Sequence, residues 1–134
     1  MTTRTTLLYF ALLATALLAV LHLVAMELYF YWTVWWFDNL IHFLAGLAGG
    51  MTALWAFYNS GIFFKHSPRL WEIIIISLSC IFVVGVAWEY FEFVYGLTGV
   101  DASHYISDTL LDLTMDLLGS VVASIIGMKV ISKM

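Results

Sequence analysis

The chain has 134 residues, of which 63% are hydrophobic and 10% charged, and its mean hydropathy is +0.99. Soluble domains carry about 25% charged residues, so this composition excludes an ordinary soluble fold and indicates that lipid is the main solvent. With five Lys and Arg residues, the chain lacks the basic surface that nucleic-acid binding requires. Its single cysteine, Cys80, excludes an internal disulfide.

Four apolar stretches are each long enough to cross about 30 Å of hydrocarbon as a helix. In chain order they are Thr5–Met26, Trp36–Tyr58, Leu70–Tyr95 and Ser107–Ile131. The first stretch exceeds the apolar core of about 7–15 residues that a signal peptide has, so we expect it to remain as a helix. The sequence therefore predicts an all-α fold, a four-helix transmembrane bundle that forms a single domain over residues 1–134.

The basic residues predict how the bundle is oriented. Arg4 precedes the first span, Lys65 and Arg69 lie between the second and third, and Lys129 and Lys133 lie at the end of the fourth. All five fall on one side of a four-span chain, which the positive-inside rule assigns to the cytoplasm. We expect a multi-pass protein in the lipid bilayer of the inner or plasma membrane, with both termini cytoplasmic. The oligomeric state, including a homo-oligomer, is left open.

Small residues predict where helices approach closely. Gly46 and Gly50 form a GxxxG pair in the second span, and Gly119, Ala123 and Gly127 have the same spacing in the fourth. Chance spacing in glycine-rich membrane helices is the alternative explanation. If the spacing is not due to chance, we expect these residues to form helix-packing faces.

Most acidic residues fall on the side away from the basic ones. Seven ionisable residues there are spaced so that they share helix faces: Asp38 and His42 in the second span, Glu89 and Glu92 in the third, and Asp108, Asp112 and Asp116 in the fourth. A charge facing lipid costs about 2.5–3.5 kcal/mol even on the permissive insertion scale, so we expect these side chains to face one another. With no Lys or Arg beside them, they are candidate ligands of a divalent metal ion: Mg²⁺, Mn²⁺, Fe²⁺ or Zn²⁺.

Structural roles are the alternative for several of these residues. Asp38 and Asp108 lie near helix N-termini, where a carboxylate can cap free N–H groups. Glu89 and Glu92 lie toward a helix C-terminus, where negative charge is disfavoured, and Asp112 and Asp116 are too deep for capping. The functional role is favoured for Glu89, Glu92 and Asp112.

The histidines and the remaining acids are less informative. An isolated histidine is often a packing residue, but His42 follows Asp38 by four residues and is a plausible ligand. Nothing in the sequence fixes the direction of His22 or His104. We expect Asp101 and Glu27 to be solvated.

Three blocks of the sequence carry a family resemblance. They are Asp38-Asn-Leu-Ile-His42-Phe-Leu-Ala-Gly46, Trp88-Glu89-Tyr-Phe-Glu92, and Asp108-Thr109-Leu-Leu-Asp112 followed by Asp116 and Gly119. The pattern resembles the YjdF-like family of small inner-membrane proteins and, more distantly, the VanZ-like family. The first resemblance implies no defined activity, and the second implies a link to reduced binding of glycopeptide antibiotics at the cell surface. Asp116 departs from the pattern, which commonly has asparagine or a small residue there, and adds a carboxylate.

Three functional hypotheses follow. The first is a cation-binding acidic site open to the outer face, of binding or transport type. Transport requires a polar path through the inner half. Few polar residues lie there, namely Thr52, Ser77, Ser79 and Ser124. The second is a metal-dependent membrane enzyme acting on a lipid-linked or cell-envelope small molecule, with one Glu as general base. The third is a structural partner subunit without metal. No nucleophile or phosphate-loop motif occurs, so catalytic residues are not assigned.

Overall fold

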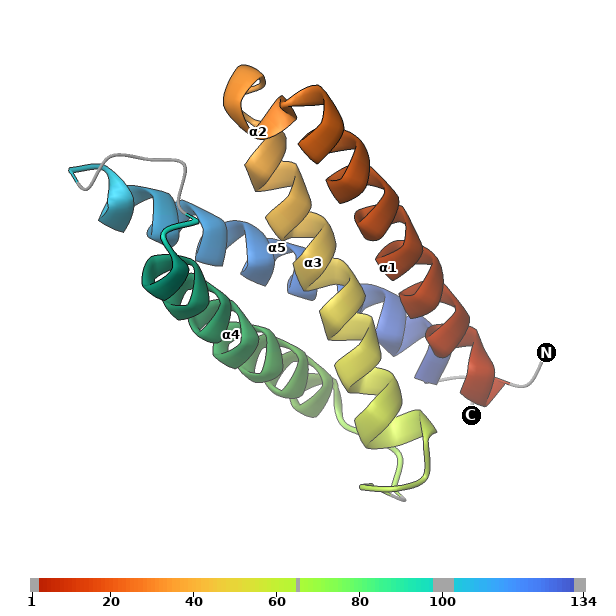
Figure 1. Ribbon diagram of the computed structural model, residues 1–134. Coiled ribbons are helices and arrows are strands. Elements are labelled where there is room, and N and C mark those ends of the chain that lie inside the picture. The colour runs from red at the N-terminus through yellow and green to blue at the C-terminus, as the bar shows by residue number, and fades with distance from the viewer. Residues whose placement is uncertain (1–2, 65, 98–102, 132–134) are drawn as a thin grey trace.

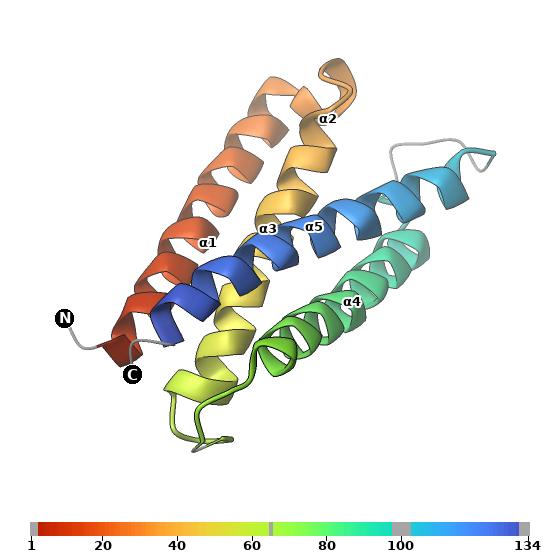
Figure 2. The same cartoon turned by 180° about the vertical axis from the view of Figure 1, so that it is seen from behind.

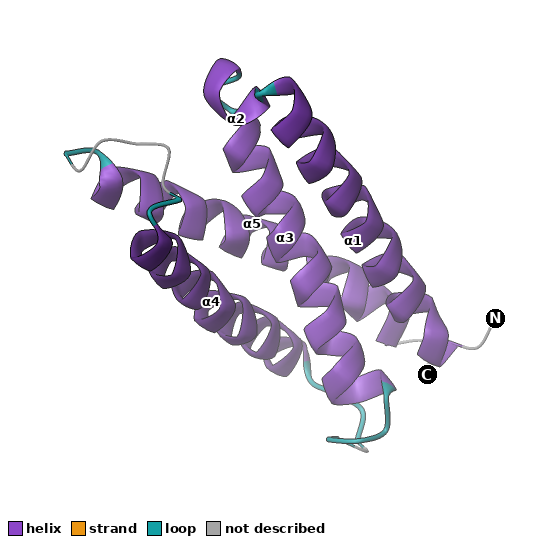
Figure 3. Ribbon diagram, in the orientation of Figure 1, coloured by secondary structure: helices purple, strands orange, loops and turns teal. Residues whose placement is uncertain are grey.

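The computed structural model describes residues 3–64, 66–97 and 103–131. Its helices are α1 (Thr3–Leu28), α2 (Phe30–Thr33), α3 (Phe37–Leu54), the π-helical turn η1 (Trp55–Asn59) that continues α3, α4 (Leu70–Tyr95) and α5 (Tyr105–Ile131). The described residues contain no strand (Figure 3). Four of the helical segments are long and apolar enough to cross a membrane. The predicted all-α fold with four spanning helices is confirmed.

The predicted spans agree with the helices to within a few residues. The helix α4 coincides with the predicted third span, whereas α5 begins at Tyr105 rather than Ser107. The short helix α2 is not predicted, because four residues are too few to show a periodic apolar pattern. The expectations for Asp101, Lys65 and Lys133 fall outside the described residues.

Local sequence explains where α4 begins and ends. The backbone N–H of Arg69 donates to Glu72 Oε2 at 2.8 Å, which closes a capping arrangement directly after Pro68. At the other end Gly96 adopts a positive φ of 63°, and the Leu97 N–H donates to the Glu92 carbonyl at 3.0 Å. This left-handed glycine stops the helix.

The helices α3 and α5 cross at the centre of the bundle. The helix α1 packs on α3, α4 packs on α5, and α1 and α4 lie on opposite sides of the central pair (Figure 1, Figure 2). The helix α1 begins and α5 ends at one end of the bundle, which we call the terminal end. The starts of α3 and α5 and the end of α4 lie toward the other end, which we call the cluster end (Figure 1).

Glycines allow the backbones of α3 and α5 to touch. A Cβ atom on Gly46 would overlap the carbonyl oxygen of Asp116, and one on Gly119 would overlap that of Phe43. The two small-residue faces therefore lie against each other: Gly46 and Gly50 on α3, and Gly119, Ala123 and Gly127 on α5. Because the two backbones are in contact here, the crossing fixes the position of α5 along α3. It therefore determines which side chains of the two helices lie next to each other.

Replacing Gly119 with alanine is expected to destabilise the bundle. The added methyl group would overlap the Phe43 carbonyl and lie 2.7 Å from the Leu47 nitrogen, and overpacking of this kind costs at least about 1–3 kcal/mol. Gly49→Ala is the matched control, because its methyl group meets only the end of the flexible Ile81 side chain, at 2.6 Å. Thermal unfolding in detergent should show a lower midpoint for Gly119→Ala only. Equal midpoints for the two variants would contradict the close crossing.

The apolar core and the buried acidic and histidine side chains occupy different halves of the interior. The buried apolar core lies toward the terminal end and consists of Leu7, Ala11, Met51, Leu54, Tyr58, Ile73, Ala123 and Ile131. Buried ionisable side chains lie toward the cluster end, namely His42, Glu89, Asp112 and Asp116. The chemistry of the molecule is therefore concentrated at the cluster end.

Candidate metal centre

Two central helices supply the buried part of the site. Asp38 and His42 lie one turn apart at the start of α3, and Asp112 and Asp116 lie one turn apart on α5. His42, Asp112 and Asp116 are only 2–6% exposed, whereas the Asp38 side chain is 43% exposed. Asp38 therefore lies at the mouth of the site and the other three lie beneath it.

The two nitrogens of the His42 ring face different carboxylates. Nε2 lies 4.0 Å from Asp38 Oδ1 and 4.0 Å from Asp112 Oδ1, while Nδ1 lies 3.4 Å from Asp116 Oδ2. One ligand atom each of Asp38, His42 and Asp112 can be chosen so that all lie within 4.8 Å of one another. Asp38 and His42 share one face of α3, and Asp112 of α5 supplies the third ligand atom of the group.

This group of residues fits a divalent metal ion. A separation of 4.0 Å is too long for a hydrogen bond between an imidazole and a carboxylate. Ligand atoms bound to one metal ion at about 2.0–2.2 Å are about 3.0–4.2 Å apart. Side-chain movements that shift the three ligand atoms by about 1 Å would therefore let them bind one ion. Imidazole and carboxylate are ligands that Zn²⁺, Mn²⁺ and Fe²⁺ accept.

Asp116 lies where it can orient the histidine. Metal-binding histidines usually donate their second ring N–H to a carboxylate, which fixes the tautomer and points the other nitrogen at the metal. Asp116 faces Nδ1 in this way and leaves Nε2 directed toward Asp38 and Asp112. Gly85 of α4 makes room for it, since a Cβ atom there would lie 2.8 Å from Asp116 Oδ2.

Asp116→Asn is expected to weaken metal binding without removing the site. Loss of such a carboxylate partner of a ligating histidine typically costs about 10–100-fold in metal affinity. Competition titration against a chelating dye would measure the affinity and the number of ions bound. An unchanged affinity, or complete loss of the ion, would contradict an orienting role for Asp116.

Glu89 links α4 to α5 beside this group. Its Oε2 accepts a hydrogen bond from Thr109 Oγ1 at 2.8 Å, and its backbone carbonyl accepts one from the Tyr105 hydroxyl at 3.2 Å. Glu92 and Asp108 are half-buried at the same end. These three acids are not in the compact group around His42, but they complete what we call the carboxylate cluster: Asp38, His42, Glu89, Glu92, Asp108, Asp112 and Asp116.

Asp38 lies in the first turn of α3, where the helix dipole favours a carboxylate, but it does not cap the helix. The N-cap position of α3 is Trp36, and no side-chain hydrogen bond caps the helix among the described residues. Asp38 instead faces His42 across one helical turn. Its carboxylate is therefore available to the site.

Tyr31 is a neighbour of the cluster that the sequence did not reveal. Its hydroxyl lies 2.7 Å from His22 Nδ1, and its ring packs edge-on against Phe37 with centroids 5.4 Å apart. Burial, together with the negative charges of Asp38 and Glu92, raises the pKa of Tyr31 to about 12. The hydroxyl keeps its proton at neutral pH and can donate it to His22. No periodic pattern predicts this pair, because the left-handed backbone of Tyr29, with a φ of 59°, sets the turn between α1 and α2.

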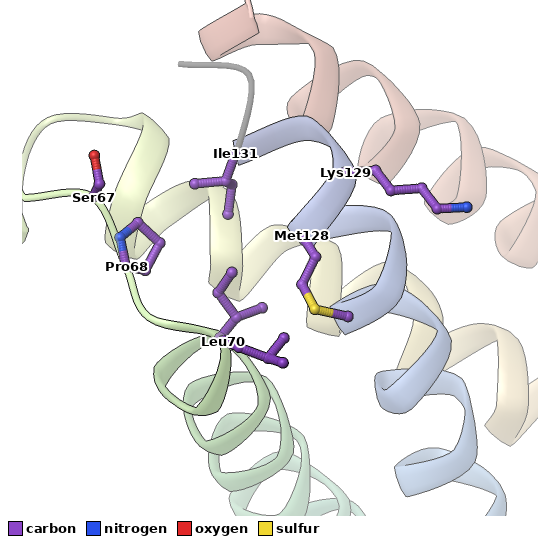
Figure 4. Close-up of a pocket in the computed structure, with 7 residues that line it drawn as sticks. Ser67, Pro68, Leu70, Met128, Lys129 and Ile131 are labelled. Atoms are coloured by element: carbon purple, nitrogen blue, oxygen red, sulfur yellow. The ribbon is translucent and has the colours of Figure 1, made fainter.

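Two surface hollows lie away from the cluster. One of about 380 Å³ lies at the terminal end and is lined by Ser67, Pro68, Leu70, Ile73, Met128, Lys129 and Ile131. Figure 4 shows the Lys129 side chain extending away from Ser67 and Pro68, so the hollow is mainly apolar. The other, of about 330 Å³, lies on α4 and is lined by Val84, Ala87, Trp88 and Phe91. Neither hollow includes a member of the carboxylate cluster.

The fold and the site define a multi-pass membrane protein with four candidate spans and a buried Asp–His cluster. The chain belongs to the DUF2238 family, described as predicted membrane proteins, whose family model matches residues 1–133. A search of curated proteins finds no match, and a search of solved structures finds none either. Membership of this family names no activity, so function has to be argued from the site.

Proposed function

We propose that this membrane protein binds a divalent metal ion through Asp38, His42 and Asp112. The observation that carries the proposal is the placement of His42 Nε2 between two carboxylate oxygens, at 4.0 Å from each, while Nδ1 faces Asp116. Buried carboxylates require a compensating charge. The sequence has no Lys or Arg near these carboxylates, so a divalent cation would supply that charge. The imidazole favours Zn²⁺, Mn²⁺ or Fe²⁺ over Mg²⁺.

The site faces away from the cytoplasm in this proposal. The basic residues Arg69 and Lys129 lie at the terminal end of the bundle, and the carboxylate cluster lies at the opposite end. By the positive-inside rule the terminal end is cytoplasmic, so both termini are inside and the site opens to the outer face of the inner or plasma membrane.

The interior favours binding over transport. A polar stripe continues from Asp116 along α5 to Ser120 and Ser124; the Ser120 Oγ lies 2.8 Å from Ser77 Oγ, and Ser124 Oγ donates to the Ser120 carbonyl at 3.0 Å. Beyond Ser124 the bundle is filled mainly by the apolar core, with Asn59 of η1 also buried there. Because a cation would have to leave its ligands for this apolar region, the site serves one face of the membrane.

The family resemblance supports the same residues. The three blocks that resemble the YjdF-like family contain the metal ligands of the proposal and the neighbouring acids, so we propose that the blocks mark the metal centre. The VanZ-like resemblance suggests work on the cell envelope, and a metal-dependent enzyme acting on a lipid-linked or envelope-derived small molecule is the alternative. An enzyme needs a substrate cleft beside the metal. Because His42, Asp112 and Asp116 are buried and only Asp38 lies at the mouth, we place binding first.

Elemental analysis of the detergent-purified protein tests the proposal. Wild type, Asp112→Asn and Glu27→Gln are purified without chelator and compared before and after metal is added back. Glu27 is exposed at the end of α1 and serves as the matched control for loss of a carboxylate. We expect stoichiometric metal in wild type and in Glu27→Gln, and loss of the ion at His42 in Asp112→Asn. Absence of metal in wild type under both conditions would overturn the proposal in favour of a proton-sharing cluster in a structural partner subunit.

A further inference from the structure

One oxygen of Glu89 is buried without a protein partner. The residue is 5% exposed, and Thr109 holds only its Oε2. Oε1 is inaccessible to solvent and has no hydrogen-bond partner among the described residues. Burying a polar atom without a partner is costly, so it needs an explanation.

Neither protonation state of Glu89 removes this cost. If the carboxylate is ionised, Oε1 lacks a donor, and if Oε1 carries a proton, that proton lacks an acceptor. The missing group is therefore a bound species, either a cation or an ordered water. Thr109 lies directly after Asp108 and three residues before Asp112, so its hydrogen bond directs the Glu89 carboxylate toward the cluster.

The charges of the cluster decide between these two species. Six carboxyl groups gather at the cluster end, and among the described residues His42 is the basic side chain that faces them. The divalent ion of the proposed function offsets two negative charges. Several carboxyl groups then remain close together in a membrane-spanning bundle, where a neutral water does not reduce the excess charge.

We infer that the carboxylate cluster binds a second divalent cation, held by Glu89 Oε1 with Asp108 and Glu92. The inference rests on the proposed function, because it adds an ion beside the one at His42. Asp108 and Glu92 are half-buried, whereas Asp112 and Asp116 are buried, so the second ion lies nearer the mouth and keeps water ligands. Its ligands are all oxygen, which suits Mn²⁺ or Mg²⁺, in contrast to the imidazole-containing first position.

Equilibrium dialysis against Mn²⁺ tests the inference, because both positions accept this ion. The full chain in detergent is freed of metal, dialysed, and analysed for bound manganese. We expect about two ions per chain for wild type and for Glu27→Gln, and about one for Glu89→Gln, as in a two-metal site that loses one ligand. Glutamine keeps the shape of Glu89 and its hydrogen bond to Thr109. Glu92→Gln is a second variant at a half-buried position and should also lose the mouth-side ion.

The outcomes separate this inference from the function on which it rests. One ion in wild type and one in Glu89→Gln would overturn the second cation, assign the Glu89 partner to water, and leave the first site standing. Two ions retained in both Glu89→Gln and Glu92→Gln would overturn the assignment of ligands. No ion in wild type would overturn the proposed function as well. Gel filtration and helical circular dichroism establish that each variant is folded before its manganese is counted.

Discussion

Replacing His42 with asparagine is expected to abolish binding at the first metal position while the helical bundle remains folded. The shorter amide can still donate a hydrogen bond toward Asp116, in place of Nδ1, but it has no atom where Nε2 faces Asp38 and Asp112. Loss of a direct ligand should lower the Zn²⁺ affinity at least about 100-fold, which corresponds to about 2.7 kcal/mol. Titration calorimetry in detergent would measure it.

His42→Gln is the companion variant. Its longer side chain brings an amide oxygen close to the position of Nε2, so part of the affinity should return. A histidine that serves only to pack α3 against α5 would give the reverse result, because asparagine and glutamine would then change thermal stability and leave metal binding untouched. Stoichiometric zinc in the asparagine variant would remove His42 from the ligand set.

The spans could be predicted from sequence because each is a long apolar segment in a chain with few charges. The helix α4 illustrates this, since Pro68 and Gly96 flank a long and mainly apolar run and the predicted bounds match the structure. The turn η1 and the helix α2 could not be predicted in this way. Both depend on a few residues whose conformation is set by the packing of neighbouring helices.

The candidate ligands could also be found from sequence, because intramembrane acids at helical spacing must face the interior. The role of each of these ligands could not be predicted from the sequence. Which nitrogen of His42 faces which aspartate depends on the rotation and level of α5 against α3, fixed by the contact at Gly46 and Gly119. The same holds for Thr109, whose hydroxyl finds Glu89 only when α4 and α5 are packed.

The inner half of the bundle gives a related lesson. Ser120 continues the four-residue spacing of the aspartates, but serine is common in membrane helices and carries no charge to mark it. The structure places it against Ser77, where the two hydroxyls are 2.8 Å apart. With Ser124, the polar stripe therefore extends about two turns beyond Asp116, and it ends at the apolar core.

Removing the metal is expected to lower the thermal stability of the protein by a large amount. Without an ion, the carboxylates of Asp38, Asp112 and Asp116 share a single imidazole in a site that is mostly buried. An ion that binds only the folded state stabilises it by about 2.7 kcal/mol at a free concentration 100 times the Kd, and by about 4.1 kcal/mol at 1,000 times. The unfolding midpoint should therefore fall on addition of a chelator and rise again with excess Zn²⁺.

Two variants separate binding from packing in this experiment. His42→Asn should show a much smaller shift between chelator and Zn²⁺ than wild type, because it lacks the first metal position. Gly119→Ala should unfold earlier than wild type in both conditions and still respond to Zn²⁺, because its defect lies in the α3–α5 contact. The response to Zn²⁺ should also shrink as the pH falls, since the ligands must be deprotonated to bind. A wild-type midpoint that is indifferent to chelator and to Zn²⁺ would mean that the cluster is held together by shared protons.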